Sequence, residues 1–272
     1  MKTITLQFCG KDSVPYKKDV QLPDEIYDEL KKVWNNTKNG EEVFKHASSG
    51  DVSNFLNKIQ EGLTPKQLRT AKCNEVLIEN LRKAVDSKGN PISKDSSELD
   101  KYQAIYKANL QIATTLNHQK NVSKNYKEQE TKMKDKVTAS KDKLNALKEK
   151  QSIKLEELEK KETEIKEKYK DLPKIKKEKL ADIKVKKDKL KAQIERANNN
   201  IEKAKMNLQK KKETTDINLG TSLGAYASPK IIYSWCKDVG LDINKIYSVA
   251  LQTKFDYAKD TSEEYWRNYG QV

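Results

Sequence analysis

Hydrophobic and polar residues alternate at the start of the chain, where Ile4, Leu6 and Phe8 occupy every second position. This period of two is typical of a β-strand with one buried face. Residues 10–13, Gly-Lys-Asp-Ser, have the composition of a tight turn, and a second strand is expected over residues 14–22. The pattern therefore predicts a small β element at the start of the chain.

Between residues 23 and 117 the apolar positions recur every three or four residues, which is the period of an amphipathic helix. Asp51 is the predicted N-cap of one such helix, and Thr64, followed by a proline, begins the next. The residues of that next helix expected to face the core are Leu68, Val76, Leu77 and Leu81. We predict helices over 23–38, 52–62, 65–85 and 99–117, with a loop over 86–97.

Residues 121–215 follow a different pattern, in which two heptad-like seams flank Pro173. The first seam is irregular, with a stutter near Gln151, whereas the second keeps an alternating spacing of three and four with Lys187 in its one charged position. The apolar residues of the second seam are Leu180, Ile183, Leu190, Ile194, Ala197, Ile201, Ala204 and Leu208. Because proline lacks the N–H that continues a helix, we predict an antiparallel coiled-coil hairpin that bends near 171–174. At 1.5 Å per residue it would protrude by roughly 60 Å.

Residues 216–272 return to a compact pattern. Ser228 and Pro229 repeat the cap-plus-proline helix start, and Gly240 fits the end of that helix. A further helix is expected over 244–257, and a last helical turn begins after 261–264. The predicted fold is mainly α: a helical module with a small N-terminal β element and a protruding hairpin. We expect three domains, at 1–120, 121–215 and 216–272.

Charge is concentrated in the predicted hairpin. The chain of 272 residues has a net charge of +14, and residues 121–215 supply +12 of it, with 30 Lys and Arg against 18 Asp and Glu. A basic excess favours a polyanionic partner such as nucleic acid. Lysine mixed with glutamate is also the composition of any solvated coiled coil that dimerises or separates domains. From this pattern alone both interpretations remain open.

Several classes of protein are excluded by the composition. No run of about 18 apolar residues and no signal-peptide pattern occurs, so no membrane partner is expected. Cys9, Cys73 and Cys236 lie far apart, which indicates reduced thiols in an intracellular protein. With His46 and His118 as the two histidines, no metal site is expected. The P-loop pattern is absent, so no nucleotide cofactor is expected either.

Tyr226 lies among small residues in the segment SLGAYASPK, just before a predicted helix start. Metal-free chemistry on a phosphodiester needs a nucleophile, cations around the non-bridging oxygens and a proton donor for the leaving oxygen. Tyrosine suits the first role because an aryl phosphate keeps the energy of the broken bond, so that resealing needs no ATP. Arginine suits the second by its planar fork, and the chain has four: Arg69, Arg82, Arg196 and Arg267.

Four segments stand out in order along the chain: FCGKDSVPY, GLTPKQLRTAKCN, LNHQK and LGTSLGAYASPKIIYSWCKDVGLDINKIY. They resemble four successive landmarks of the eukaryotic-type (type IB) DNA topoisomerases. A charged helical hairpin between the last two also matches that family. The resemblance covers nearly the whole chain, as the C-terminal half of the family's catalytic core with its linker and C-terminal domain.

The resemblance implies an isomerase that nicks one strand of duplex DNA, lets the free end rotate and reseals it, without metal or nucleotide. Tyr226 would attack the phosphorus and form a 3′-phosphotyrosyl bond. Arg69 would hold a non-bridging oxygen, and His118 would hydrogen-bond the same phosphate. Lys11 would protonate the departing 5′ oxygen. Taken without the resemblance, a lysine in such a turn is usually solvated and a histidine at a helix end is usually structural.

Further residues fall where the family contacts DNA near the cut, and the DNA backbone is the expected partner surface more than the base edges. These DNA-binding candidates are Lys66, Gln119, Thr221 and Asp12. The family resemblance also implies localisation in the nucleus.

The sequence departs from the family pattern in four respects. The family uses another arginine ahead of its Gly-Lys-Asp motif, and no arginine precedes Arg69 here; the cap that clamps DNA is missing as well. Leu223 stands where a lysine is usual, and Ala225 replaces the asparagine usual before the tyrosine. Loss of one preorganised charge donor costs on the order of 10²–10³ in rate. We therefore expect weak activity from this chain alone, with a separate polypeptide, or the rest of a longer protein, supplying the cap and first arginine.

Two alternative functions remain open at this point. A tyrosine recombinase shares the nucleophile and the cationic pocket, but usually has no long coiled-coil arm immediately before its tyrosine. A non-catalytic, DNA-binding coiled-coil adaptor derived from the same fold would explain the missing arginine and Leu223.

Overall fold

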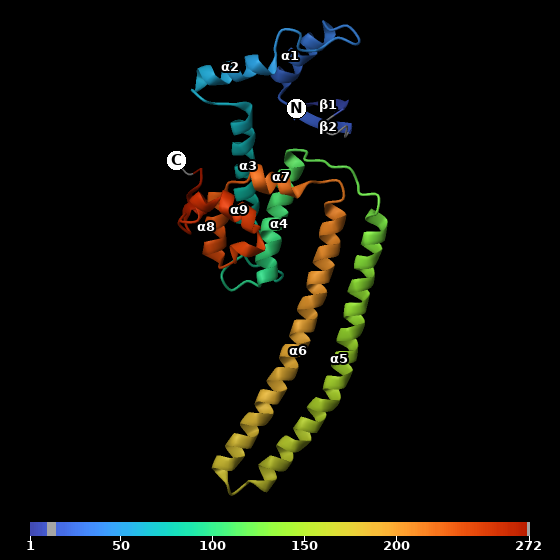
Figure 1. Ribbon diagram of the computed structural model, residues 1–272, viewed down its shortest axis with the longest axis vertical. Helices are drawn as coiled ribbons and strands as arrows, with labels where there is room; N and C mark the ends of the chain where they lie inside the picture. The colour runs from blue at the N-terminus through green and yellow to red at the C-terminus, as the bar shows by residue number, and fades with distance from the viewer. Residues whose placement is uncertain (10–14, 271–272) are drawn as a thin grey trace. The chain divides into compact units, whose positions relative to one another are not determined.

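The computed structural model describes residues 1–9 and 15–270. The chain forms two compact units, one of residues 1–121 and 216–272 and the other of residues 122–215. Both consist mainly of helices, and the described residues contain one sheet, of two strands (Figure 1). The predicted fold class, mainly α with a small N-terminal β element and a helical hairpin, is confirmed.

The sheet is an antiparallel pair of β1 (Lys2–Cys9) and β2 (Pro15–Leu22). Lys2 lies opposite Leu22, and the ring of Phe8 stacks on Tyr16 with centroids 4.4 Å apart. The alternation seen in the sequence thus corresponds to two paired strands. The turn predicted at residues 10–13 lies outside the described residues.

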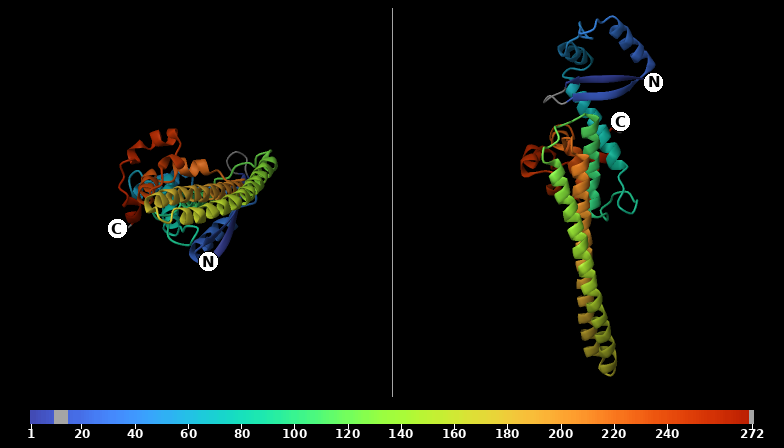
Figure 2. Two further views of the ribbon diagram at one scale, coloured as in Figure 1. Left: turned by 90° about the horizontal axis from the view of Figure 1, so that it is seen from below. Right: turned by 90° about the vertical axis from the view of Figure 1, so that its right-hand side faces the viewer.

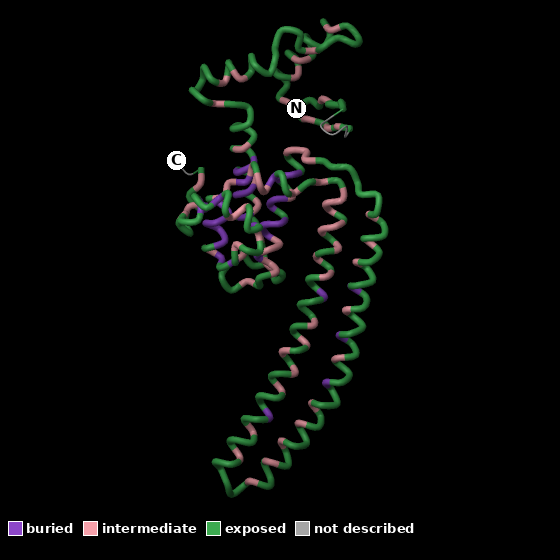
Figure 3. Tube along the Cα trace, viewed as in Figure 1, coloured by how far each residue is buried: buried purple, intermediate pink, exposed green. Residues whose placement is uncertain are grey.

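The first two helices, α1 (Asp24–Asn35) and α2 (Ser49–Ile59), contain no buried residue. Figure 3 shows this part of the tube in green and pink. Large apolar side chains are exposed on both helices, among them Trp34 (66%), Phe55 (63%) and Ile59 (63%). Amphipathic helices bury their apolar face when they have a full partner, and the contacts of α1 with β1 and of α2 with α3 leave these side chains uncovered.

The predicted cap of α2 is wrong, because Ser48 and not Asp51 is the N-cap. The Asp51 backbone N–H donates to the Ser48 hydroxyl, while the Asp51 carboxylate accepts from the Ser48 backbone N–H at 2.8 Å. This reciprocal capping box satisfies two helix-terminal donors and starts the helix three residues earlier than predicted.

The helix α3 (Pro65–Arg82) begins as predicted, with Thr64 as its N-cap and proline at the first position. Leu77 and Leu81 are buried and Val76 packs against the core, as expected, but Leu68 is 48% exposed. The prediction for Leu68 is wrong because the C-terminal half of α3 supplies the core residues, and there Cys73 and Ile78 are also buried. The next helix, α4 (Glu98–Thr115), packs against α3.

The C-terminal segment forms α7 (Leu219–Ala225), α8 (Pro229–Val239) and α10 (Tyr265–Asn268), with short elements between the last two. Gly240 ends α8 with φ of 68°, in the left-handed conformation that glycine adopts most easily, as predicted. The single helix predicted over 244–257 is wrong. It is divided into η2 (Ile243–Lys245), α9 (Val249–Lys254) and η3 (Asp256–Ala258), because Ser248 caps a new helix start in the middle of the segment.

The hydrophobic core of the first unit lies among α3, α4 and α8, where Figure 3 shows most of the buried positions. The rest of the C-terminal segment closes it, since Tyr247 is 1% and Trp266 8% exposed. The fully buried large side chains include Trp235, Tyr247, Leu77, Ile112, Ile231, Ile232 and Val239. Burial of this kind contributes about 1.5–3 kcal/mol per aliphatic side chain. The helices that carry the candidate site are therefore fixed by a well-packed core.

The second unit is a hairpin of α5 (Tyr126–Lys168) and α6 (Pro173–Glu213), which lie side by side (Figure 2). Pro173 is the first residue of α6, so the chain reverses where the sequence predicted. Lys187, the charged residue of the second seam, donates to the Glu162 carboxylate of the facing helix at 2.7 Å. Hydrogen bonds from Lys166 and Lys187 lower the pKa of Glu162 to about 2. None of the described helices is apolar enough over a sufficient length to cross a membrane.

Gln151 marks a polar layer inside this hairpin. Its side chain is 2% exposed, and its Nε2 donates to Gln193 Oε1 at 3.0 Å, while its own Oε1 has no partner. We expect Gln151→Leu to raise the free energy of unfolding by about 1 kcal/mol, because it removes a buried unsatisfied acceptor. Gln193→Leu should lower it, because both polar atoms of Gln151 then lack a partner. Thermal unfolding followed by circular dichroism checks this opposite sign, and equal effects of the two changes would contradict it.

Candidate active site

Tyr226 occupies the C-terminal cap of α7 and is half-buried. Its backbone N–H donates to the Ser222 carbonyl at 3.1 Å, and the N–H of Ala227 donates to the same oxygen at 2.9 Å. The seven-residue α7 was not predicted, since its small residues show no apolar period. Asn218, whose side chain accepts from the Gly220 N–H as an N-cap, is the one local signal that marks its start.

Two other candidate catalytic residues lie against the Tyr226 ring. The Arg69 guanidinium carbon, from α3, lies 5.4 Å from the ring centroid. His118 follows α4 and is far from both of these residues in the sequence. The centroid of its imidazole ring lies 5.2 Å from the Tyr226 ring centroid. Three of the four predicted catalytic side chains, from three separate segments, therefore gather at one place.

The position of His118 is set by backbone pairing. Asn117 has a φ of 53°, and this left-handed residue turns the chain at the end of α4. The His118 carbonyl then accepts from the Asn218 N–H at 2.7 Å, and the Lys120 N–H donates to the Asp216 carbonyl at 2.8 Å. Residues 118–120 are thus paired with the segment that begins α7, which brings the histidine to the tyrosine.

The environment of His118 favours a neutral imidazole. Burial lowers its pKa, and the nearby Arg69 charge lowers it further. Its Nδ1 is buried and has no hydrogen-bond partner. A buried N–H without an acceptor is costly, so we assign the proton to Nε2 and leave Nδ1 as the bare acceptor. In this form His118 can donate one hydrogen bond without carrying a charge.

We expect the pKa of His118 in the folded chain to lie below the ordinary value of 6.5. Since folding disfavours its protonation, the stability linked to this residue is present above pH 6.5 and is lost as the pH falls below it. The measurement is an NMR titration of a chain with His46→Gln, which leaves His118 as the single histidine. Arg69→Gln should raise the pKa again by removing the neighbouring charge. A measured pKa of His118 at or above 6.5 would contradict the conclusion that its environment favours a neutral imidazole.

The candidate DNA-binding residues lie close in sequence to these three. Lys66 is exposed on the first turn of α3, Gln119 is exposed next to His118, and Thr221 is exposed on α7. Lys11 and Asp12 lie outside the described residues. No motif marked Lys254, whose ammonium on α9 donates to the Gly224 carbonyl of α7 at 2.8 Å.

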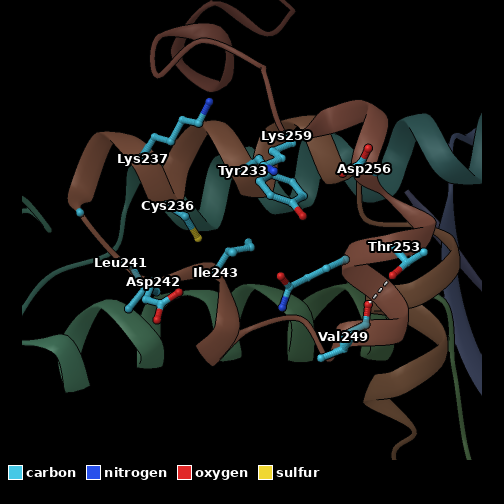
Figure 4. Close-up of a pocket in the computed structure, with 12 residues that line it drawn as sticks. Tyr233, Cys236, Lys237, Leu241, Asp242, Ile243, Val249, Thr253, Asp256 and Lys259 are labelled. Atoms are coloured by element: carbon cyan, nitrogen blue, oxygen red, sulfur yellow. Dashed lines mark hydrogen bonds between the residues drawn. The ribbon is translucent and has the colours of Figure 1, made fainter.

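A separate cleft lies along α8, η2 and α9, and none of the candidate residues lines it (Figure 4). Cys236 points into this space, but burial raises the pKa of its thiol to about 12, so it is a poor nucleophile. Figure 4 also shows the Thr253 hydroxyl bound to the Val249 carbonyl of its own helix. Among residues 1–9 and 15–270, no group of His, Cys, Asp and Glu could hold a metal ion. The cleft is therefore separate from the Tyr226 site, and its thiol is a poor rival to Tyr226 as a nucleophile.

Comparisons with known proteins identify the family of the chain. Residues 1–151 match the family model described as eukaryotic DNA topoisomerase I, catalytic core, and residues 198–267 match the C-terminal topoisomerase domain. The chain is 27% identical over 266 residues to DNA topoisomerase 1 of Caenorhabditis elegans, covering 96% of this chain and 29% of that protein. It is 26% identical over 261 residues to DNA topoisomerase 1 of Homo sapiens, covering 96% of this chain and 31% of that protein.

A third relative is the mitochondrial DNA topoisomerase I of Rattus norvegicus, 25% identical over 261 residues, with 96% of this chain and 40% of that protein covered. The chain thus spans well under half the length of these relatives. The catalytic-core match alone includes more than half of the 272 residues. On these matches, the chain belongs to the eukaryotic DNA topoisomerase I family.

Proposed function

We propose that the chain is the catalytic part of a type IB DNA topoisomerase that cuts and reseals one strand of duplex DNA through Tyr226. The observation that carries the proposal is the placing of Arg69 and His118 against the Tyr226 ring, at 5.4 and 5.2 Å. A nucleophile, a cation and a neutral hydrogen-bond donor are the groups that metal-free phosphoryl transfer needs. The proteins it resembles are named DNA topoisomerases, which supports the same reaction.

In the proposed cleavage step the Tyr226 phenol oxygen bonds to phosphorus while the bond from phosphorus to the 5′ oxygen breaks. The phenol loses its proton to solvent, and the 5′ oxygen leaves as a hydroxyl after taking a proton, for which Lys11 is the proposed donor. Arg69 stabilises the charge on a non-bridging oxygen, and His118 donates its Nε2 proton to the same phosphate. Resealing is the reverse reaction.

The intermediate makes a separate energy source unnecessary. Because the 3′-phosphotyrosyl ester keeps the energy of the broken bond, the 5′ hydroxyl can attack it after the free end has rotated. The proposed DNA contacts are Lys66, Gln119, Thr221 and Asp12. The net charge of +12 on residues 121–215 supports a general attraction to the phosphate backbone. Residence in the nucleus is part of the proposal, although one relative is mitochondrial.

We propose further that full activity needs the cap and first arginine, carried on a separate polypeptide or on the rest of a longer protein. No arginine precedes Arg69 in the sequence. The exposed apolar side chains of α1 and α2, such as Trp34 and Phe55, support a protein partner for this region, since patches of this kind mark interaction sites.

Covalent capture tests the proposed function. The chain is mixed with a nicked duplex whose cut strand cannot be resealed, alone and with a fragment of a relative that carries the cap and first arginine. A protein–DNA band that survives denaturation, formed alone or only with the added fragment, supports the proposal. Absence of the band in both mixtures, with DNA binding retained, would favour the non-catalytic adaptor, for which Leu223 is the supporting observation.

A further inference from the structure

We infer that two buried asparagines, Asn74 and Asn109, are positioning residues that hold the turn carrying Tyr226 from both sides. Asn74 is 5% and Asn109 6% exposed, and both lie in the hydrophobic surroundings of α3 and α4. A buried amide persists where its polar atoms are satisfied, and in this structure both side chains bond to the segment 219–228. Their effect on DNA cleavage rests on the proposed function, whereas their effect on the conformation of Tyr226 does not.

Asn109 holds the start of the turn. Its Nδ2 donates to the Leu219 carbonyl at 3.2 Å, and its Oδ1 accepts from the Ser222 hydroxyl at 2.7 Å. Ser222 is 0% exposed, so no water can replace this acceptor, and the other acceptor within reach of its hydroxyl is the Leu219 carbonyl at 3.0 Å. Since α7 has seven residues and a short helix is marginal without tertiary contacts, these bonds fix α7 on α4.

Ser222 is also bonded directly to the backbone of the tyrosine. The Ser222 carbonyl accepts the N–H groups of both Tyr226 and Ala227, at 3.1 and 2.9 Å. The residue that Asn109 holds by its side chain thus holds Tyr226 by its backbone. A shift of Ser222 would carry the phenol with it.

Asn74 holds the far side of the turn. Its Oδ1 accepts from the Ser228 backbone N–H at 2.8 Å. Ser228 is the N-cap of α8 and its own side chain makes no capping bond, so Asn74 fixes where α8 begins. Ala227 is the single residue between Tyr226 and Ser228, so the tyrosine has little freedom to move.

The same two helices carry the groups that face Tyr226. Arg69 lies on α3 five residues before Asn74, and His118 follows the end of α4, which contains Asn109. Each helix therefore places one phosphate-binding candidate and one end of the nucleophile's turn. A side chain held this way keeps the geometry of attack, for which a misplacement of 1 Å can cost on the order of 10² in rate.

The conformational part of the inference is tested with 3-fluorotyrosine incorporated at position 226 and read by ¹⁹F NMR on the full chain. Asn109→Leu and Asn74→Leu should each broaden the single wild-type signal or split it into several. Asn74→Asp keeps an acceptor for the Ser228 N–H, next to a helix N-terminus that favours a negative charge, and should restore one sharp signal. The matched control is Asn80→Leu, because Asn80 lies on α3 but donates to the Val76 carbonyl of its own helix.

Should Asn109→Leu fail to fold, Ser222→Ala tests the same bond by removing the donor instead of the acceptor. An unchanged signal in the folded variants of both asparagines, or equal broadening by Asn80→Leu, would overturn the inference. This readout needs no reaction, so it stands even if the chain proves to be non-catalytic.

The catalytic part is tested by single-turnover covalent capture at saturating nicked DNA, together with the DNA dissociation constant. We expect Asn109→Leu and Asn74→Leu to slow capture at least about tenfold while affinity changes little. Asn80→Leu should leave both unchanged. Equal losses of rate and affinity would contradict a positioning role. If the wild-type chain gives no capture, either alone or with the fragment that carries the cap and first arginine, the proposed function is refuted and the ¹⁹F result decides the inference.

Discussion

Replacing Tyr226 with phenylalanine is expected to abolish the covalent protein–DNA product, since the change removes only the oxygen that attacks phosphorus. The ring remains, so its packing against Arg69 and His118 is kept. DNA affinity should stay within about twofold, because affinity comes mainly from contacts to the phosphate backbone. The measurement is a denaturing gel after incubation with nicked duplex, together with a binding titration.

The control for this change is Tyr233→Phe. Tyr233 lies on α8, seven residues further along the chain, where it lines the separate cleft in Figure 4. Its loss of a hydroxyl should not affect the covalent product. A product that persists in Tyr226→Phe would mean that another residue attacks the phosphorus, and the proposed role of Tyr226 would be wrong.

Removing the charge of Arg69 is expected to lower the rate of DNA cleavage by about 10²–10³, the usual effect of losing one preorganised donor to developing charge. The change Arg69→Gln keeps the length of the side chain approximately and removes the cation. Arg69→Lys should recover part of the rate, because an ammonium supplies charge without the planar pair of donors. The rate is measured by single-turnover capture at saturating DNA.

Arg82→Gln provides the matched control on the same helix. Arg82 ends α3 and donates to the Arg267 carbonyl at 2.8 Å, away from Tyr226. It should leave the rate unchanged. Were Arg69→Gln to weaken DNA binding as much as it slows cleavage, Arg69 would be a general phosphate contact and its proposed role in the transition state would be lost.

Local patterns predicted most of the elements. The alternation of Ile4, Leu6 and Phe8 gave β1, and Thr64 with its following proline marked the start of α3. These signals are local, since they depend on side-chain period or on one capping bond. Pro173 likewise marks the reversal of the hairpin.

Apart from the N-cap of α2, which is a local misassignment of Ser48, the errors arise where tertiary contacts decide the structure. The helix α7 has no apolar period, and its hydrogen bonds to Asn109 come from a residue more than a hundred positions earlier. Ser248 divides the predicted helix at 244–257 because Tyr247 before it is buried in the core. At Leu68 the period was right, but the first turns of α3 lie beyond the core.

The candidate residues came from the family resemblance, and their proximity could not be predicted from local pattern. His118 meets Tyr226 because residues 118–120 pair with the segment before α7, across nearly a hundred residues of hairpin.

At Leu223 the family resemblance raised a question that the structure answers. The family pattern expects lysine at this position, but the leucine packs against the hydrophobic core, so the position has a structural use in this chain.

The most direct test of the account is to identify the amino acid that becomes joined to DNA. The captured complex is digested with nuclease and trypsin, and the modified peptide is sequenced by mass spectrometry. Cleavage after Lys212 and Lys230 gives a peptide with Tyr226 as its single tyrosine. We predict a nucleotide attached to Tyr226 through its 3′ phosphate. A nucleotide on any other residue, or one joined through a 5′ phosphate, would contradict the central claim.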